Sequence, residues 1–366
     1  MTDKSAMKRA LELAYKGTGL VSPNPRVGAV IIKDGSIISE SFHRRFGEPH
    51  AEANAINQLT DDQVKGSTLV VNLEPCSHQG KNPPCADLII EKGISRVVVG
   101  TTDPNPLVAG QGIEKMRQAG IEVETGVLEN ECLWANRFFF KHITTGLPYV
   151  VVKVAQSLNG MIATSTGQSK WITCEESRTR THALRSEIDA VLIGKRTASI
   201  DNPELTVRNV IGRNPYRIVF DTHLTLPLSI RNFTDDQRKQ TIVCCSHESS
   251  VTRKSETLRA AGLRIVPAQL DAFGKLELEP ILRTLLSEYS IGSIMVEGGS
   301  TIFSSFIASD LTDELHVFIA PMIIGNGLNA FASYKINFLN EAKHFSIKGI
   351  SQCGKDIHVL AVREQK

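Results

Sequence analysis

The sequence predicts two α/β domains in one chain, divided near residue 145. The chain has 366 residues, whereas a typical domain has about 100–150. Hydrophobic residues make up 41% of the sequence, which is enough for two cores. Helical apolar patterns also alternate with β-branched runs twice, over residues 1–145 and again over 146–366. These three observations favour two separately folded α/β units.

The first region, residues 1–145, is predicted to form a three-layer α/β/α sandwich. Met7, Ala10, Leu11 and Ala14 share one helical face, and residues 27–42 are predicted to form a β-hairpin turning at Lys33-Asp34-Gly35. Further helices are expected at 50–59, 83–93 and 112–120, and strands at 68–75, 95–104 and 121–127.

The second region begins with an apolar strand at residue 147 and again alternates helix and strand. A helix is expected at 176–187, and strands at 189–194, 216–221, 241–246, 263–268 and 293–299. The end of the chain differs, because residues 313–325, 343–354 and 355–364 are typical of antiparallel closing strands. The aromatic segment 134–148 is expected to be a packed junction between the two regions.

Composition argues against several classes of function. The formal net charge of +2 gives no field strong enough to indicate a polyanionic partner. No run of 18 apolar residues is present, so no membrane helix is expected, and the first residues lack the pattern of a signal peptide. The seven cysteines are an odd number and widely spread, which indicates a reducing compartment, and we expect the cytoplasm.

Three segments contain the residue types of a catalytic zinc site. His50 precedes Glu52 by two positions, Cys76 follows Pro75, and Cys85 comes nine residues after Cys76. One imidazole and two thiolates are ligands that zinc favours, and they leave a fourth position for a water that zinc makes nucleophilic. A nearby carboxylate, Glu52, is predicted to act as the general acid/base. A purely structural site would need a fourth protein ligand, for which His78 is the nearby candidate.

The spacing of the two cysteines is unusual, because nucleobase deaminases usually have P-C-x-x-C. The segments SPNPRVGAVI, HAEANAI, NLEPCSHQGKNPPCADLII and GTTDPNPLVAGQGI resemble the deaminase half of the bifunctional riboflavin-biosynthesis deaminase/reductase family, in which this loop is lengthened. The resemblance implies a cytidine-deaminase-like fold for residues 1–145. It also implies substrate contacts from Asn24 and Lys81, and weaker candidates are His43 and Asn105. Asn82 stands where that family usually has threonine.

A strand-to-helix turn at Gly298-Gly299 is the candidate phosphate site of the second region, where no G-x-G-x-x-G pattern follows a strand. The segments KVAQSLNGMIA, SKWITCEESR, DNPELTVR and VEGGSTIFSSF resemble the reductase half of the same family, whose fold is similar to dihydrofolate reductase. By this likeness NADPH is expected to contact Ala155, Trp171, Thr197, Asp201, Gly299, Ser300, Thr301, Ile302, Phe303, Ser304 and Ser305. The substrate is expected to contact Ser169, Arg185, Leu205, Arg208 and Glu297. Asn159 stands where the family commonly has aspartate.

The resemblance implies a bifunctional enzyme that uses Zn²⁺ and NADPH. Residues 1–145 would deaminate 2,5-diamino-6-ribosylamino-4(3H)-pyrimidinone 5′-phosphate by zinc-hydroxide hydrolysis. Residues 146–366 would then reduce the ribosyl group to a ribityl chain. We expect small pyrimidine ribonucleotides as partners, no nucleic acid, no membrane, and a homo-oligomer.

Two alternatives belong to other functional classes. A deaminase of tRNA or another polynucleotide would need a basic strip with interleaved aromatic residues, and aromatics at 6% with a net charge of +2 disfavour it. A zinc-stabilised binding or regulatory protein would have no use for Glu52. Ammonia release from the free nucleotide, and NADPH oxidation with the deaminated product, distinguish these possibilities.

Overall fold

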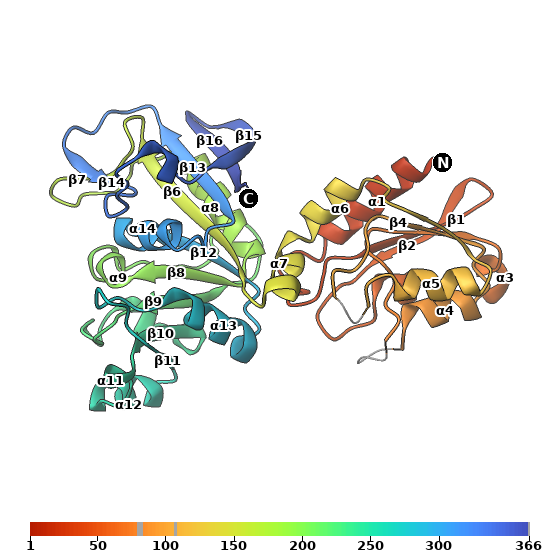
Figure 1. The fold of residues 1–366 in the computed structure, drawn as a ribbon, viewed down its shortest axis with the longest axis horizontal. Coiled ribbons are helices and arrows are strands. Elements are labelled where there is room, and N and C mark those ends of the chain that lie inside the picture. The colour runs from red at the N-terminus through yellow and green to blue at the C-terminus, as the bar shows by residue number, and fades with distance from the viewer. Residues whose placement is uncertain (79–82, 106–107, 365–366) are drawn as a thin grey trace. The chain divides into compact units, whose positions relative to one another are not determined.

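The computed structural model describes residues 1–78, 83–105 and 108–364. The chain divides into two compact units, Met1–Gly146 and Leu147–Lys366. Each unit has its own sheet and its own apolar core (Figure 1). In the described part of the chain, no helix has the length and apolar character needed to cross a membrane.

The first unit contains a five-stranded sheet in the order β2-β1-β3-β4-β5. Strand β1 pairs antiparallel with both β2 and β3, whereas β3, β4 and β5 run parallel. The strands are β1 (Gly28–Lys33), β2 (Ser36–Phe42), β3 (Thr68–Val71), β4 (Arg96–Val99) and β5 (Glu122–Thr125). Because β3 and β4 are parallel, both of their carboxyl ends lie at the same edge of the sheet.

Helices cover both faces of this sheet, as Figure 1 shows. Alternate strand residues point to opposite faces, so Val30 and Val70 pack with Met7 of α1, while Ile31 and Leu69 belong to the opposite core. That opposite core includes residues of α2, α4 and α5. The helices are α1 (Asp3–Tyr15), α2 (Ala51–Ile56), α3 (Asp61–Val64), α4 (Cys85–Glu91), α5 (Gln111–Gln118), α6 (Glu129–Ala135) and α7 (Arg137–Thr145).

The second unit contains a nine-stranded sheet in the order β11-β10-β9-β8-β12-β6-β13-β16-β15. A separate pair is formed by β7 and β14. The strands are β6 (Tyr149–Ser157), β7 (Met161–Thr164), β8 (Ala190–Gly194), β9 (Tyr216–Phe220), β10 (Thr241–Ser246), β11 (Arg264–Ala268), β12 (Ser293–Gly298), β13 (Glu314–Ala320), β14 (Gly327–Asn329), β15 (Phe345–Cys353) and β16 (Asp356–Arg363). From β11 to β13 all neighbours are parallel, so their carboxyl ends form one edge.

One face of the second sheet packs against α13 and α14, through Leu282 and Phe306 respectively. The helices are α8 (Glu175–Glu187), α9 (Lys195–Asp201), α10 (Arg231–Thr234), α11 (His247–Ser250), α12 (Arg253–Ala260), α13 (Leu278–Tyr289) and α14 (Ser300–Ala308), with 3₁₀ turns η1 (Arg238–Gln240) and η2 (Leu339–Glu341). Helices α9 and α14 follow directly after β8 and β12, so their first turns lie at the carboxyl edge of the sheet.

The α/β prediction for both units is confirmed. The segments 313–325, 343–354 and 355–364, predicted to be antiparallel closing strands, form β13, β15 and β16, and β16 pairs antiparallel with both β13 and β15. Strand β13 also runs parallel to β6 on its other side, so it joins the closing strands to the parallel part of the sheet. Periodicity sets which face a side chain takes but not the direction of the neighbouring strand, so the sequence did not define this second pairing.

Candidate active sites

Three elements of the first unit bring His50, Cys76 and Cys85 together. His50 is the N-cap residue of α2, Cys76 follows β3 after a short connection, and Cys85 is the first residue of α4. His50 Nδ1 lies 3.5 Å from Cys76 Sγ and 3.4 Å from Cys85 Sγ. The three ligand atoms all lie within 4.8 Å of one another, the separation expected around one tetrahedral metal.

The two cysteines are joined by backbone hydrogen bonds. Cys85 N–H donates to Cys76 Sγ at 3.3 Å, and Ala86 N–H donates to the Cys76 carbonyl oxygen at 3.1 Å. A hydrogen bond from the Cys85 thiol outweighs burial and lowers the pKa of the Cys76 thiol to about 4, with His50 and the Cys85 N–H contributing in the same direction. The same contact and burial raise the pKa of the Cys85 thiol. The pair therefore favours a thiolate at Cys76, the form of cysteine that binds metal.

Glu52 lies beside these three residues but offers no ligand atom to the same cluster. It is only 3% exposed, and its Oε2 receives no hydrogen bond from the described residues. Burial raises the pKa of the Glu52 carboxyl. A buried carboxylate oxygen without a partner, next to one imidazole and two thiols, fits a catalytic zinc centre with an adjacent proton carrier.

A cavity of about 320 Å³ opens onto this cluster, and we call it the His50 pocket. Its lining includes the predicted residues Asn24, His43 and Asn105. Asn24 Nδ2 lies 3.2 Å from His43 Nε2, and His43 Nδ1 lies 3.1 Å from the Pro49 carbonyl oxygen. Burial lowers the pKa of His43, which favours the neutral imidazole. The predicted contact Lys81 and the variant position Asn82 lie outside the described residues.

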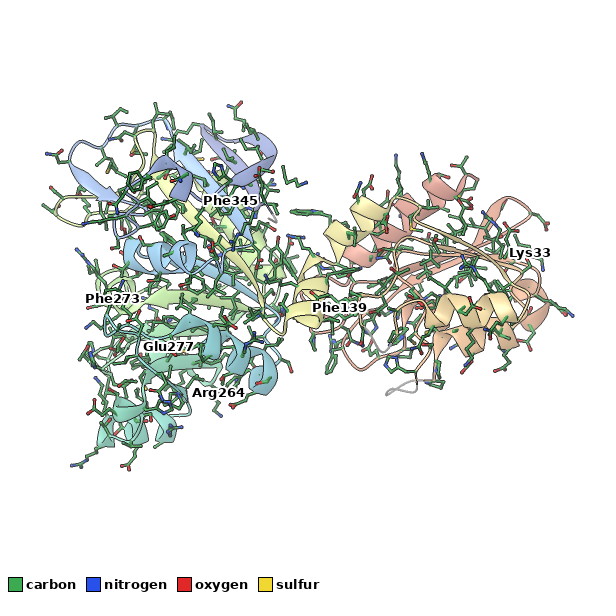
Figure 2. The ribbon with its side chains drawn as sticks, in the orientation of Figure 1. Lys33, Phe139, Arg264, Phe273, Glu277 and Phe345 are labelled. Carbon is green, nitrogen blue, oxygen red and sulfur yellow. The ribbon has the colours of Figure 1, made fainter. Side chains whose placement is uncertain are left out.

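Sequence reasoning missed several residues of the His50 pocket. Phe46, Phe139 and Ile143 form apolar parts of its wall, and Asp103 lines it with a polar group. Phe139 projects from α7, labelled in Figure 2, in the segment that the sequence marked as a junction. Its aromatic run signalled packing, but nothing in the pattern indicated that the packing would form a pocket wall.

A second buried carboxylate, Glu74, organises the loop between β4 and α5. Its Oε2 accepts from the N–H groups of Asp103 and Gly110 at 3.1 and 3.0 Å, and its Oε1 accepts from those of Gly112 and Ile113 at 3.0 and 3.3 Å. A Cβ at Gly112 would lie 2.2 Å from the Pro75 carbonyl oxygen, so this close approach requires glycine. The loop that presents Asp103 is thereby fixed beside Pro75-Cys76.

We expect Glu74→Gln to weaken substrate binding at the His50 pocket. The amide would place an NH₂ group against N–H donors, and an unpaired buried group costs about 1–3 kcal/mol. The first unit should unfold at lower temperature, and KM for the reaction at the His50 pocket should rise more than kcat falls. Glu131→Gln, at an exposed position of α6, is the matched control, and the unfolding temperature of the second unit is the internal reference. Unchanged KM would contradict this role.

The second unit contains a cavity of about 700 Å³, here called the Arg185 pocket. Arg185 binds Glu297 with two hydrogen bonds, Nε to Oε1 at 2.5 Å and Nη2 to Oε2 at 2.9 Å, and Nη1 donates to the Thr206 carbonyl oxygen at 2.9 Å. Lys153 Nζ lies 3.5 Å from Glu297 Oε2. Burial alone would raise the pKa of Glu297, but Arg185 and Lys153 outweigh it and lower it to about 2.

The Arg185 pocket contains many of the reductase residues predicted above. Those that line it are Ala155, Ser169, Trp171, Arg185, Thr197, Asp201, Leu205, Arg208, Glu297, Gly299 and Phe303. Trp171 is 68% exposed and stacks under Arg178, whose guanidinium carbon lies 4.6 Å from the ring centre. His182 also lines the pocket; burial, together with Arg185 and Arg208, lowers the pKa of His182 to about 4, so its ring is neutral at pH 7.

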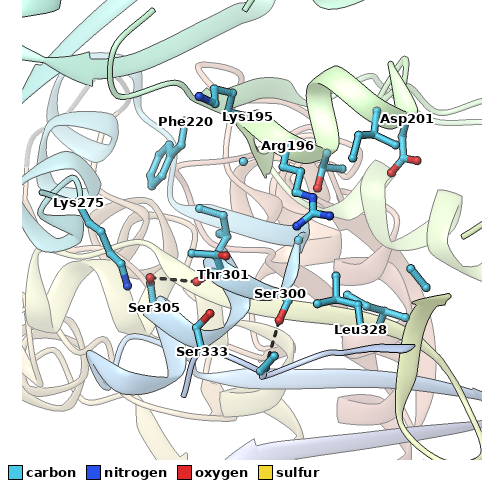
Figure 3. Close-up of a pocket in the computed structure, with 18 of the residues that line it drawn as sticks. Lys195, Arg196, Asp201, Phe220, Lys275, Ser300, Thr301, Ser305, Leu328 and Ser333 are labelled. Atoms are coloured by element: carbon cyan, nitrogen blue, oxygen red, sulfur yellow. Dashed lines mark hydrogen bonds between the residues drawn. The ribbon is translucent and has the colours of Figure 1, made fainter. Parts of the chain in front are cut away.

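A neighbouring cavity of about 490 Å³ surrounds the first turn of α14, and we call it the Gly299 pocket (Figure 3). Its predicted lining residues are Ser169, Thr197, Asp201, Gly299, Ser300, Thr301, Ile302 and Ser305. Gly298 has φ of 150°, and a Cβ at Gly299 would lie 3.1 Å from Thr197 Oγ1. This open glycine turn at a helix N-terminus fits a phosphate-bearing cofactor.

Ser304, predicted to contact NADPH, and Asn159, the departure from the family pattern, make structural contacts and line neither pocket. Ser304 is buried, and its Oγ accepts a hydrogen bond from Ser333 N–H at 3.1 Å. Asn159 holds the Ile324 backbone, donating from Nδ2 at 2.5 Å and accepting at Oδ1 at 3.1 Å. The amide of Asn159 provides both the donor and the acceptor of this pair, which a carboxylate would not.

Lys153, Lys275 and Arg196 also line the two pockets, and sequence reasoning missed them. Lys153 had a usable signal, because it is a single charge inside the apolar run of β6. Such a charge in a central strand needs a partner or a ligand. Lys275 had none, since it follows a short surface loop without a recognisable motif.

Comparison with known proteins assigns both units to described families. Residues 1–101 match the model of the cytidine and deoxycytidylate deaminase zinc-binding region, and residues 148–359 match the model of the RibD C-terminal domain. The chain is 44% identical to the riboflavin biosynthesis protein RibD of Aquifex aeolicus over 99% of this chain and 98% of that protein.

Two solved structures resemble the whole chain. One is RibD of Acinetobacter baumannii, with a TM-score of 0.89 and 34% identity, covering 99% of both chains. The other is a diaminohydroxyphosphoribosylaminopyrimidine deaminase/5-amino-6-(5-phosphoribosylamino)uracil reductase of Thermotoga maritima, with a TM-score of 0.86 and 40% identity, covering 99% of this chain and 98% of that chain. The chain therefore belongs to the RibD family of bifunctional riboflavin-biosynthesis enzymes, which combine a zinc-dependent deaminase with an NADPH-dependent reductase.

Proposed function

We propose that the first unit deaminates 2,5-diamino-6-ribosylamino-4(3H)-pyrimidinone 5′-phosphate and that the second unit reduces the ribosyl group of the product. The observation that carries this proposal is Glu52, whose buried Oε2 lacks a partner among the described residues beside His50, Cys76 and Cys85. The deaminase and reductase named for the Thermotoga maritima relative supply the substrate class.

We assign His50, Cys76 and Cys85 as the zinc ligands. Zinc bound there supplies an activated water for attack on an amine-bearing ring carbon. Glu52 takes a proton at its carboxylate and delivers it to the leaving amine, because it is adjacent to the ligands and its Oε2 is free to accept. Asn24, His43 and Asn105 orient the pyrimidine, and the apolar wall of the His50 pocket excludes competing water.

In the second unit, NADPH supplies the hydride. The N–H groups of the first turn of α14 bind the cofactor's phosphates, since no side chain among the described residues caps that helix end. Glu297 remains ionised and accepts hydrogen bonds from the ring amines of the substrate, while Arg185 holds its carboxylate in place. Arg185 binds Glu297 through Nε and Nη2, whereas Arg208 binds Glu204 and Thr206 through Nη1 alone, at 2.6 and 3.1 Å. We therefore assign the ribose phosphate chiefly to the remaining N–H groups of Arg208, which lines the same pocket.

We further propose that the protein is a cytoplasmic homo-oligomer that acts on free nucleotides. None of the seven cysteines, all of which are described, forms a disulfide, which supports a reducing compartment, the cytoplasm. The outermost strand β15 leaves Ile347 and Ile350 exposed at 62% and 65%, which supports a homo-oligomer. The net charge of +2 supports free nucleotides as substrates and no nucleic-acid partner.

Product identification tests the proposed function. Incubation of the full chain with the diaminopyrimidinone phosphate should release ammonia without NADPH and should form the ribityl compound only when NADPH is added. A chain of residues 146–366 should oxidise NADPH with the deaminated nucleotide and release no ammonia from its precursor. Ammonia release from that shorter chain, or none from the full chain, would refute the assignment of activities to the two units.

A further inference from the structure

The Gly299 pocket also indicates how the cofactor is oriented in it, an inference that rests on the proposed reductase function. The Gly299 pocket and the Arg185 pocket share a set of lining residues at their junction: Ile162, Ser169, Thr197, Asp201 and Gly299. Hydride transfer requires the nicotinamide to lie against the substrate. The nicotinamide must therefore occupy the junction, and the adenosine end must occupy the opposite end of the Gly299 pocket.

That opposite end is formed by the end of β9, the start of α13 and the outer side of α14. Phe220, Leu276 and Leu278 provide an apolar surface for a purine, while Lys275 and Ser305 provide polar groups. Figure 3 shows the ammonium of Lys275 directed toward the Ser305 hydroxyl, on the opposite side of the pocket from Asp201. The adenosine end of the cofactor would thus lie beside the Lys275 ammonium, on the opposite side of the pocket from the junction where the hydride is transferred.

The loop that carries Lys275 is rigidly built. Asp271 Oδ1 accepts from the N–H groups of Phe273 and Lys275 at 2.8 and 2.9 Å, and Asp271 N–H donates to the Lys275 carbonyl oxygen at 2.7 Å. Gly274, with φ of 72°, provides the left-handed turn residue. Phe273 is 87% exposed at the surface of the unit (Figure 2). The turn therefore presents Lys275 toward the pocket and Phe273 away from it.

The other cations of the Gly299 pocket are placed differently. Lys195 Nζ already donates to Thr225 Oγ1 at 3.0 Å. The guanidinium of Arg196 lies on the Asp201 side in Figure 3, nearer the junction. By contrast, no hydrogen bond or ion pair engages the Lys275 ammonium within residues 1–78, 83–105 and 108–364. The Lys275 ammonium therefore faces the adenosine end of the pocket, and its N–H groups are available to bind a ligand.

We propose that the Lys275 ammonium binds the 2′-phosphate on the adenosine ribose and so selects NADPH over NADH. A phosphate monoester carries close to two negative charges at pH 7 and is a strong acceptor for an ammonium donor. NADH has a ribose hydroxyl at that position and gains nothing from the ammonium charge. Discrimination would then depend on a residue distant from both the substrate and the reacting carbon.

Equilibrium binding tests this assignment without relying on turnover. The dissociation constants of NADP⁺, NAD⁺, 2′,5′-ADP and 5′-AMP would be measured on the full chain and on Lys275→Gln. We expect NADP⁺ and 2′,5′-ADP to bind about tenfold or more weakly to the variant, the loss of one charged hydrogen bond. NAD⁺ and 5′-AMP should change less than about twofold, since they lack the phosphate in question.

Lys239→Gln, on the exposed turn η1, controls for the loss of one positive charge, and unchanged binding of NAD⁺ and 5′-AMP reports that the second unit, which carries Lys275, is folded. Equal weakening of NADP⁺ and NAD⁺ would overturn the proposal, as would a selective loss found in Lys195→Gln and not in Lys275→Gln. If the unaltered chain fails to bind NADP⁺ at all, the proposed reductase function itself is wrong. If it binds NADP⁺ but Lys275→Gln keeps the preference, only this assignment fails.

Discussion

Glu52→Gln is expected to reduce deamination by about 10²–10⁴-fold, the usual contribution of a general acid/base. The amide has nearly the shape of the carboxylate but cannot accept and return a proton. Because Glu52 offers no ligand atom to the His50, Cys76 and Cys85 cluster, the zinc content should stay at one per chain. Ammonia release and elemental analysis of the same preparation would measure both quantities.

Glu129→Gln, at the exposed start of α6, is the matched control for Glu52→Gln and should deaminate normally. NADPH oxidation with supplied intermediate should be unchanged in both variants, because Glu52 belongs to the first unit. A drop of only about twofold with full zinc would show that another group moves the proton. Loss of zinc together with activity would show that Glu52 supports the metal instead.

Cys85→Ser is expected to remove zinc and abolish deamination while leaving reduction intact. Serine cannot supply the soft thiolate that zinc favours, so two of the three proposed protein ligands would remain. Cys353→Ser, in the second unit, is the matched control and should retain zinc. The metal content, ammonia release and NADPH oxidation of both variants are the measurements.

Full zinc and normal deamination in Cys85→Ser would mean that the second thiolate ligand lies elsewhere. A simultaneous loss of both activities in a folded Cys85→Ser chain would mean that the two reactions share a site. Either outcome would contradict the assignment of one reaction to each unit, whereas loss of deamination alone would support it.

Many elements of the fold and most of the zinc-site residues could be predicted from short local motifs. His50 and Glu52 are neighbours in sequence and open a helix, so their common location follows from local structure alone. The carboxyl ends of β3 and β12 were marked by Pro75 and by Gly298-Gly299, residues that interrupt a strand. Cys85 was placed at the site because it opens a predicted helix after the Pro75-Cys76 pair, while its unusual spacing from Cys76 was accounted for only by the family resemblance.

The missed residues depend on contacts between distant segments. Lys153 and Glu297 are neighbours because β6 and β12 pair, a pairing that sequence patterns do not define. Glu74 accepts hydrogen bonds from backbone N–H groups that begin at Asp103, 29 residues later in the chain. Lys275 reaches its pocket because α13 and α14 pack on the same face of the sheet. Strand order and helix placement set these neighbours, and one sequence reveals neither.

The backbone hydrogen bonds that join Cys85 and Ala86 to Cys76 separate the metal ligands from the eight residues between the cysteines. Doubling the length of a flexible loop costs only about 0.6 kcal/mol. Changes in the length of this spacer should therefore cost the zinc site little stability while both hydrogen bonds are kept, whereas changes at Lys81, the predicted substrate contact, should alter substrate binding. The spacer is then a natural position for evolutionary change in substrate range, and for grafting loops between deaminases whose cysteine spacings differ.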